Sequence, residues 1–398
     1  MSRKICLAYS GGLDTSIILH WLVYEKSYDL IAFSADIGQE IFNKNEIEKR
    51  AKTTGAEKVI IKDLKKELIE EFAFRAIKSD AYYEDGYLLG TSIARPLIAK
   101  HQVEIAKREN CNILSHGATG KGNDQIRFEL AYKVLYPEAI IYSPWKDKEF
   151  LKSFKSREEM IKYAEKNKLD IHSKSKSYSI DDNLLHISHE GGILEDPNNS
   201  SHKNLIKSSK ENSSKLIEIE FEKGVPKILF IDDKKIEDSV EIFNLLNELS
   251  KRYCFGIIDI VENRFIGLKS RGVYYQGSLE ILHKAHIGLE ATILDKKTFH
   301  HKLRLGFEIG KLIYEGRWFS SYLQSLFFYV DKVNEIIDGS VKIFIRPNAF
   351  NIVARKPKNK FIYDKIKSFG SFKMVDFEPE DAKGFINITA IEDSWNIN

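Results

Sequence analysis

The chain of 398 residues is longer than a single hydrophobic core usually serves, which predicts at least two domains. Its hydrophobic fraction of 43% is ordinary for a globular protein, and its net charge of +3 argues neither for nor against nucleic acid binding. No stretch approaches the roughly 18 uncharged apolar residues that a membrane-spanning helix needs.

Three cysteines, Cys6, Cys111 and Cys254, lie far apart and in or beside apolar runs. An odd number without a CxxC pair does not build a disulfide framework, so we expect all three to be buried and reduced. The first residues lead directly into a strand-like run and do not resemble a signal peptide. These features predict a cytoplasmic protein.

The first 145 residues alternate short apolar runs with helical patterns. The apolar runs predict five strands, at residues 5–9, 30–33, 59–61, 112–114 and 139–142. Helical spacing predicts helices between them, at residues 17–22, 46–51, 65–80, 97–109 and 124–134. Continuously apolar strands separated by helices are typical of a parallel sheet covered on both faces. We therefore expect a doubly wound α/β domain.

The next part of the chain is more polar. The alternating pattern ends at Pro144, and a capping box at residues 156–159 predicts one more helix, to about Asn167. The polar segment 173–177 is a candidate crossing between domains. The segment 198–215 is rich in Ser, Asn and Lys and predicts a surface loop.

From residue 216 onward the pattern indicates a second, α+β domain. Apolar residues alternate with glutamates at 217–221, and a second strand signal at 228–231 follows a turn, which predicts a hairpin. Helices are expected at 239–251, 278–299, 300–316 and 320–337, and further strands at 341–345 and 351–354. The last forty residues predict one short helix, at 364–369, and an irregular tail. No internal repeat is visible.

A glycine-rich loop, Ser10-Gly11-Gly12-Leu13-Asp14-Thr15-Ser16, joins the first expected strand to the first helix. Successive glycines let backbone N–H groups turn toward one point, and the helix N-terminus adds its positive dipole, so the loop suits phosphate. Ser10, Thr15 and Ser16 can donate hydroxyl hydrogens to phosphate oxygens. Asp14 would repel phosphate, and we expect it to cap the helix or to approach a magnesium ion. The alternative is a glycine turn with an ordinary N-cap.

A second glycine-rich turn, residues 117–122, also follows an expected strand and opens a helix. Ligands of open α/β sheets bind at the carboxyl ends of strands, so two such turns side by side can hold one long polyanion. Asn123 and Arg127 share a face of the next helix, and an arginine there suits a carboxylate. A surface salt bridge is the alternative for Arg127, but its place just after a glycine turn favours a ligand.

Several other polar residues have a structural alternative. Pro96 suits the first turn of a helix, so residues 90–95 are expected to form a loop in which Ser92 can donate to a carboxylate. Glu262 lies inside an apolar strand-like run and is costly to bury without a ligand or an ion pair. Tyr274 could simply pack. His116, beside the second turn, is expected to be structural.

The loop at residues 10–16 resembles the pyrophosphatase loop of the N-type ATP pyrophosphatases, which cut ATP between the α- and β-phosphates. Other polar strings select one member of this superfamily: YLLGTSIARP (87–96), SHGATGKGNDQIRF (115–128), YSIDDN (178–183), ISHEGGILE (187–195) and DIVENRFIGLKSRGVY (259–274). Together with the loop they resemble argininosuccinate synthase from about residue 3 to residue 290. Residues 381–388 also match the family's C-terminal tail.

The resemblance implies ATP, Mg²⁺, citrulline and aspartate as ligands, and small-molecule partners without nucleic acid or membrane. It implies ATP contacts at Ala8, Tyr9, Ser10, Gly11, Gly12, Leu13, Asp14, Thr15, Ser16, Ala35 and Gly117. It implies aspartate contacts at Thr119, Asn123 and Asp124, and citrulline contacts at Tyr87, Ser92, Asn123, Arg127, Ser179, Ser188, Glu262 and Tyr274. Asp14, Asp124 and Arg127 are the expected catalytic residues. The sequence does not identify the magnesium ligands.

The resemblance and the pattern together divide the chain into an ATP-binding domain (1–168), a synthetase domain (169–360) and a C-terminal oligomerisation arm (361–398) of a homotetramer. One departure from the family concerns residues 275–279, Tyr-Gln-Gly-Ser-Leu, where the family usually has a Glu-Thr-Pro turn. It leaves the placement of Tyr274 open.

Two rival functions remain at this point. A tRNA thiolase would normally need a sulfur-carrying cysteine pair and a basic face, and the sequence shows neither. A non-catalytic nucleotide sensor would be expected to have lost loop glycines or polar residues such as Asp14 or Arg127, which are intact.

Overall fold

The computed structural model describes residues 3–120, 122–170, 178–201, 205–206, 208–359 and 379–394. Its N-terminal part is built on a parallel sheet with the strand order β3-β2-β1-β4-β5. The strands are β1 (Lys4–Ala8), β2 (Asp29–Asp36), β3 (Lys58–Asp63), β4 (Ile113–Ser115) and β5 (Ile140–Ile141). The expectation of a doubly wound α/β domain is thereby confirmed.

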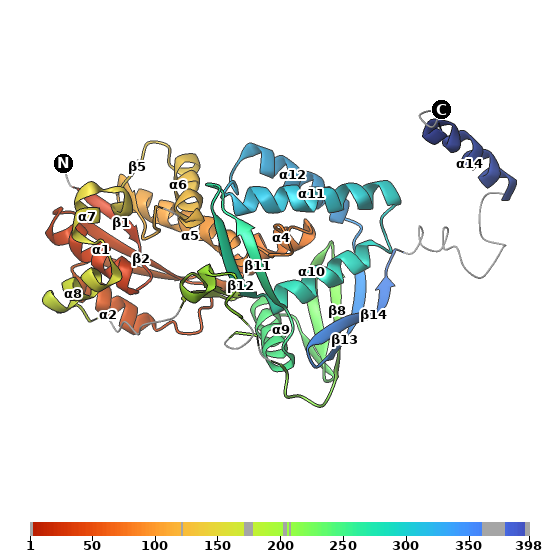
Figure 1. Cartoon of the computed structure of the whole chain (residues 1–398), viewed down its shortest axis with the longest axis horizontal. Coiled ribbons are helices and arrows are strands. Elements are labelled where there is room, and N and C mark those ends of the chain that lie inside the picture. The colour runs from red at the N-terminus through yellow and green to blue at the C-terminus, as the bar shows by residue number, and fades with distance from the viewer. Residues whose placement is uncertain are drawn as a thin grey trace.

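Helices cover both faces of this sheet (Figure 1). They are α1 (Leu13–Tyr24), α2 (Lys44–Thr54), α3 (Lys65–Glu67), α4 (Phe74–Lys78), α5 (Gly90–Arg108), α6 (Asn123–Leu135), α7 (Lys148–Ser153) and α8 (Arg157–Lys166), with a π-helical segment η1 (Leu68–Ala73) and a 3₁₀ turn η2 (Pro144–Lys146). Side chains along β1 alternate between the two faces, since Ile5 and Leu7 belong to one core cluster and Cys6 and Ala8 to the other. The strand that carries the glycine loop is therefore anchored from both sides.

Helix α5 begins earlier than the sequence predicted. Residues 90–95, expected as a loop, form its first turns, and Pro96 lies inside the helix. Leu89 enters the helix in the left-handed conformation, with φ of 68°. Most residues from 90 to 97 are buried, so this segment lacks the polar face that would give a helical pattern in the sequence. Burial also offsets the backbone hydrogen bond to the Ser92 carbonyl that Pro96 cannot make.

The second part of the molecule contains two antiparallel sheets. One has the order β10-β9-β8-β13-β14 and confirms the expected hairpin; its strands are β8 (Lys215–Glu222), β9 (Val225–Ile231), β10 (Lys234–Ile236), β13 (Gly339–Arg346) and β14 (Ala349–Pro357). The other has the order β11-β12-β7-β6, from β6 (Ser179–Asn183), β7 (His186–Glu190), β11 (Ile257–Asn263) and β12 (Lys269–Tyr275). A short 3₁₀ turn, η3 (Gly192–Glu195), follows β7.

Helices α9 (Ser239–Tyr253) and α10 (Gly277–Glu290) pack against these sheets, whereas α11 (Lys296–Tyr314) and α12 (Ser321–Asn334) pack on each other and on α5 and α4. The predicted division between 278–299 and 300–316 is wrong, because the break falls at residues 291–295. Asp295 caps α11 there by accepting from the backbone N–H groups of Lys297 and Thr298, at 3.0 and 3.1 Å.

The irregular tail predicted after residue 370 is also wrong in part, because α14 (Pro379–Ser394) is helical. Gly384 and several β-branched residues give this segment a low helix propensity, which hid the helix from the sequence. Helix α14 stands clear of the rest of the molecule, and Phe385, Ile386, Ile388 and Ile391 are between 62 and 71% exposed (Figure 1). The expected segments 173–177 and 364–369 lie outside the described residues.

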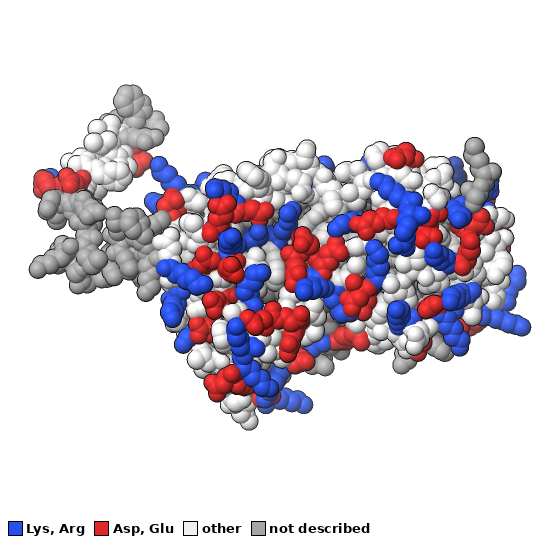
Figure 2. Space-filling model, turned by 180° about the vertical axis from the view of Figure 1, so that it is seen from behind, with Lys and Arg blue, Asp and Glu red and all other residues white. Residues whose placement is uncertain are grey.

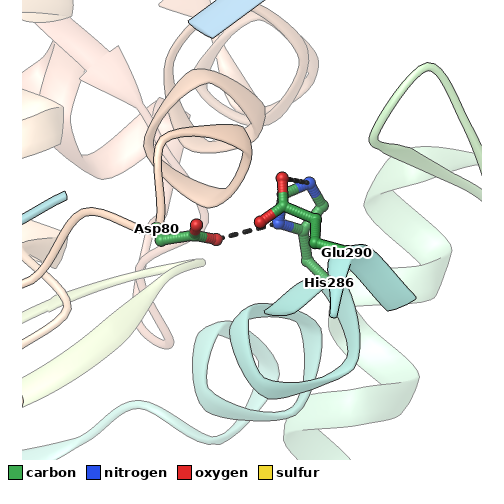
Figure 3. Close-up of side chains that lie close together, drawn as sticks. All are labelled: Asp80, His286 and Glu290. Carbon is green, nitrogen blue, oxygen red and sulfur yellow. Dashed lines mark hydrogen bonds and ion pairs between the residues drawn. The ribbon is translucent and has the colours of Figure 1, made fainter. Parts of the chain in front are cut away.

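A buried cluster of charged side chains joins the two parts of the chain. Asp80, just beyond α4, contacts His286 of α10 at 2.9 Å, and Glu290 lies one helical turn further along α10 (Figure 3). The three side chains are close enough to share a metal ion, but the ammonium of Lys302 already lies 2.6 Å from Asp80 and 2.8 Å from Glu290. A lysine of α11 thus supplies the positive charge.

Other general features agree with the composition. Acidic and basic side chains are interspersed over the face that Figure 2 shows. No helix within the described ranges is long and apolar enough to cross a membrane. The three cysteines are free, and Cys6 and Cys111 are buried as expected. Cys254 is only half-buried, because it forms the left-handed end of α9 at the surface.

Candidate functional site

A cleft with a cavity of about 670 Å³ opens where the parallel sheet meets the sheet of β6, β7, β11 and β12. Its floor consists of the carboxyl ends of β1, β2 and β4, where an open α/β sheet binds ligands. Most of the predicted site residues line it: Ala8, Tyr9, Ser10, Asp14, Thr15, Ala35, Tyr87, Gly117, Thr119, Asn123, Asp124, Arg127, Ser179, Ser188, Glu262 and Tyr274.

The glycine loop is held open by its own side chains. Ser10 Oγ accepts from the backbone N–H of Gly12 at 3.3 Å and lies 3.0 Å from Thr15 Oγ1. Gly11 has a φ of 77°, and its carbonyl accepts from Arg50 at 2.6 Å. The peptide carbonyl of Gly11 is therefore turned toward Arg50, and the start of α1 is left to an anion, although the Gly12 N–H itself is taken by Ser10.

The second glycine turn lies directly beside the first. A Cβ at Gly117 would come within 2.6 Å of the Thr15 methyl group, so only a glycine permits this approach. This contact confirms the predicted pairing of the two turns at one edge of the sheet. His116 is fully buried and stacks on Phe128 with a ring-centroid distance of 5.4 Å, as expected for a structural histidine.

Not every residue of the glycine loop faces the cleft. Leu13, the first residue of α1, packs in the core, and the Ser16 hydroxyl pairs with Tyr9 Oη at 2.9 Å, so neither lines the cavity. Helix α1 is capped by Gly12, and Asp14 lies in its first turn without acting as the cap. Burial raises the pKa of Asp14, because the cleft wall removes part of its water.

A row of alternating charges runs along one side of the cleft. Arg95 donates to Asp181 at 2.6 Å and to Asp124 at 2.9 Å, and Arg127 donates to the other oxygen of Asp124 at 2.8 Å. Burial favours the protonated form of Asp124, but the two guanidinium groups outweigh it and lower the pKa to about 2. Arg127 is further fixed by donating to the Tyr314 carbonyl at 3.0 Å.

Two carboxyl groups, the buried Glu262 and the half-buried Glu190, lie together around Tyr274 in the cleft. Tyr274 Oη lies 3.2 Å from Glu262 and 3.5 Å from Glu190, and Arg264 contacts Glu190 at 3.3 Å. Burial, and then the neighbouring Glu262, raise the pKa of Glu190 to about 7. Burial also raises the pKa of Glu262. This corner of the cleft has an excess of negative charge and suits a cationic group.

Strand pairing brings together the predicted site residues in the sheet of β6, β7, β11 and β12. Ser188 pairs with Asp181 on one side and with Tyr274 on the other, so the three side chains form a row across β6, β7 and β12. Tyr87 packs on Tyr274 with a ring-centroid distance of 4.4 Å. Ser92 does not line the cleft: it is fully buried in α5, and its Oγ has no hydrogen-bond partner among the described residues.

The sequence analysis missed several residues that line the cleft. Arg95, Asp181, Glu190, Arg264 and Tyr314 line it and make the contacts described above. Glu190 lies two residues beyond Ser188 on the same strand face, a signal that the period of two could have provided. Tyr314 comes from the end of α11 and had no local signal.

The comparisons with known proteins agree along the whole chain. The family model described as arginosuccinate synthase N-terminal HUP domain matches residues 4–170, and that of the arginosuccinate synthase C-terminal domain matches residues 178–395. Argininosuccinate synthase from Mus musculus is 44% identical over 401 residues, which cover 98% of this chain and 96% of that protein. The enzyme of the same name from Caldicellulosiruptor saccharolyticus is 44% identical over 394 residues, with coverages of 97% and 95%.

Proposed function

The chain belongs to the argininosuccinate synthase family, and we propose that it joins citrulline to aspartate while cleaving ATP to AMP and pyrophosphate. The observation that carries this proposal is the single cleft in which the phosphate loop faces both the row of alternating charges and the acidic corner. One site thus offers places for a nucleotide and for two amino acids.

The reaction proceeds in two steps. The ureido oxygen of citrulline attacks the α-phosphorus of ATP, and the bond to the bridging oxygen of pyrophosphate breaks. The amine of aspartate, once it has lost a proton, then attacks the ureido carbon and displaces AMP to give argininosuccinate. No side chain has to form a covalent intermediate, so positioning and neutralisation of phosphate charge supply the catalysis.

Each region of the cleft takes one reactant. The loop around Ser10 and Thr15, with Gly117 beside it, binds the ATP phosphates, and Ala35 lies at the nucleoside. Thr119, Asn123 and Asp124 contact aspartate at the start of α6. The guanidinium of Arg127 faces the citrulline carboxylate, supported by the buried position of this side chain at the cleft wall.

The acidic corner holds the α-ammonium group of citrulline. Glu262 and Glu190 provide the negative charge there, and Tyr274 holds the two carboxyl groups in place. Tyr87, Ser179 and Ser188 complete the pocket. Holding the ammonium and the carboxylate by separate charged groups leaves the ureido end free to face the phosphate loop.

Magnesium fits this cleft through Asp14. Both oxygens of Asp124 are engaged by arginines, whereas Asp14 lines the cleft beside the hydroxyls of Ser10 and Thr15. Mg²⁺ usually takes one or two carboxylates together with phosphate oxygens and water. Asp14 would hold the ion, which supplies neutralisation of phosphate charge.

The assembly and location are part of the proposal. We assign residues 1–168 to the ATP-binding domain, 169–360 to the synthetase domain and 361–398 to an arm that joins subunits of a homotetramer. The exposed apolar side chains of α14 support an arm that packs on another subunit; a monomer in sedimentation would contradict it. Free cysteines support the cytoplasm.

The decisive experiment measures pyrophosphate release with ATP, magnesium, citrulline and aspartate, and with each component omitted in turn. Release should stop without citrulline or magnesium, and argininosuccinate should appear only with aspartate. Pyrophosphate release that ignores citrulline would overturn the proposed function.

Arg127→Ala should raise the KM for citrulline on the order of a hundredfold, because the charge-assisted contact between the guanidinium and the citrulline carboxylate is lost. ATP binding should stay nearly unchanged. The control is Arg108→Ala, which removes an exposed arginine that pairs with Glu109 outside the cleft. If ATP affinity falls while the citrulline response is unchanged, the role of Arg127 is wrong.

A further inference from the structure

The segment that departs from the family, residues 275–279, contains a buried glutamine that bridges two parts of the cleft wall. Gln276 is 2% exposed and lies between the end of β12 and the start of α10. Its Oε1 accepts from the backbone N–H of Leu88 at 2.9 Å, and its Nε2 donates to the Gly86 carbonyl at 2.8 Å. The two ends of one side-chain amide thus grip the backbone on both sides of Tyr87.

The gripped loop is strained, and the backbone N–H of Asn263 also holds it by donating to Glu84 at 3.0 Å. Glu84, Gly86 and Leu89 all have positive φ, at 46°, 100° and 68°. Left-handed conformations of residues other than glycine are unfavourable, so such a turn persists only when its surroundings hold it. Within the turn, Tyr83 and Tyr87 exchange backbone hydrogen bonds of 2.8 and 3.0 Å. The Gln276 amide joins this small turn to the end of β12, in the sheet of β6, β7, β11 and β12.

The bridge connects two tyrosines of the cleft. Tyr274 lies two residues before Gln276 on β12, and its ring packs on Tyr87 at a centroid distance of 4.4 Å. The backbone of Gln276 is fixed as well, since its N–H donates to the Gly256 carbonyl at 2.7 Å and its carbonyl accepts from Glu280 at 2.8 Å. The Gln276 amide therefore fixes the backbone beside Tyr87 relative to the end of β12.

We propose that Gln276 is a positioning residue for the citrulline pocket, which sets Tyr87 against Tyr274 through two backbone hydrogen bonds. The inference rests on the proposed function, because it takes this pocket as the citrulline site. A glutamine suits the task because its amide supplies one acceptor and one donor at the same time. A carboxylate could only accept and would face the Gly86 carbonyl, while an aliphatic side chain would leave both backbone groups unpaired.

The test uses exchange of labelled pyrophosphate into ATP in the presence of citrulline, which reports the first step alone. Gln276→Leu should raise the KM for citrulline by about ten- to a hundredfold, since two buried backbone groups lose their partners. The KM for ATP should stay within about twofold. The control is Gln324→Leu on α12, whose amide donates to the Trp318 carbonyl outside the cleft; it should leave both constants unchanged.

Gln276→Glu separates positioning from mere packing. At high pH its carboxylate should repel the Gly86 carbonyl and raise the KM for citrulline. When protonated, the carboxyl group has the donor and acceptor of the amide, so the ratio of variant to wild-type KM should return toward one as the pH falls from 8.5 to 6. Taking the ratio at each pH cancels the titration of native groups such as Glu190. The Gln276→Leu variant should show no such recovery.

The outcomes distinguish the two hypotheses. Absence of citrulline-dependent exchange in the wild-type protein would refute the proposed function. Exchange in the wild type, with a wild-type citrulline KM in Gln276→Leu, would overturn the role of Gln276. If Gln276→Leu does not fold, as thermal unfolding would show, Gln276→Glu decides alone: a KM ratio that does not change with pH would also overturn it.

Discussion

The pKa values of two carboxyl groups in the cleft are shifted in opposite directions by their surroundings. Asp124 is held between two arginines, and its pKa falls to about 2, whereas the pKa of Glu190 rises to about 7 through burial and the nearby Glu262. Asp124 is therefore ionised at any pH at which the enzyme works, and its negative charge is balanced by Arg95 and Arg127. Glu190 changes its charge within the neutral range, so the acidic corner depends on pH.

This shift predicts a pH dependence of citrulline binding. Above about pH 7 Glu190 is ionised and attracts the citrulline ammonium group; below it, Glu190 gains a proton and the attraction is lost. The KM for citrulline should therefore rise as the pH falls from 8 to 6, and kinetic measurements across this range check it. In Glu190→Gln the KM should be higher at pH 8 and nearly independent of pH. A Glu190→Gln profile that keeps the wild-type slope would show that another group titrates.

At the scale of elements, the start of α5 is positioned by one close contact. A Cβ at Gly90 would lie 2.4 Å from the ring of His186 on β7, so only glycine lets the helix approach the second sheet this closely. His186 in turn lies 2.8 Å from Thr91 Oγ1, and Thr91 donates to Asp181 at 3.0 Å. The start of α5 is thus linked to β6, the strand that carries Asp181 of the row of alternating charges.

Gly90→Ala should destabilise the protein by about 1–3 kcal/mol, the usual cost of adding a methyl group to a filled core. Urea unfolding measures it. Gly384→Ala on α14 is the control, because a Cβ there has open space, and it should cost no stability. An unchanged unfolding midpoint in Gly90→Ala would mean that His186 moves aside freely.

At the scale of the whole molecule, the two parts of the chain are joined by buried charges as well as by apolar packing. Lys302 contacts both Asp80 and Glu290, and one ammonium can balance only one carboxylate. Burial would raise the pKa of Asp80, but Lys302 outweighs it and lowers the value, whereas burial raises the pKa of Glu290 to about 7. The cluster is close to neutral when Glu290 keeps its proton.

Lys302→Met should therefore destabilise the folded protein by about 3–5 kcal/mol, since the buried Asp80 carboxylate loses its positively charged partner. Denaturant unfolding at pH 7.5 measures the loss. Because protonation can relieve an uncompensated carboxylate, the loss should shrink as the pH is lowered toward 5. Lys332→Met, an exposed lysine on α12, is the control and should be neutral. A loss that is equal at both pH values would contradict the charge explanation.

The sequence by itself predicted the parallel sheet and the phosphate loop, because both depend on local order. Apolar strands between helices repeat along the chain, and the loop at 10–16 is a continuous string whose glycines have a local function. The limits of two helices were predicted wrongly. Residues 90–95 were predicted as a loop, because burial on all sides removes the helical period. The break between α10 and α11 was placed too late, because a short cap is a weak signal.

The tertiary structure alone decided which residues of the polar strings face one another. Arg95, Asp124 and Asp181 come from two helices and a strand, and their alternation of charge exists only after packing. The same is true of Gln276, which is unremarkable in sequence and hydrogen-bonds to the backbone of Gly86 and Leu88, nearly two hundred positions away. Sequence strings determine local backbone and chemistry, whereas contacts between distant strings depend on packing, which no single string encodes.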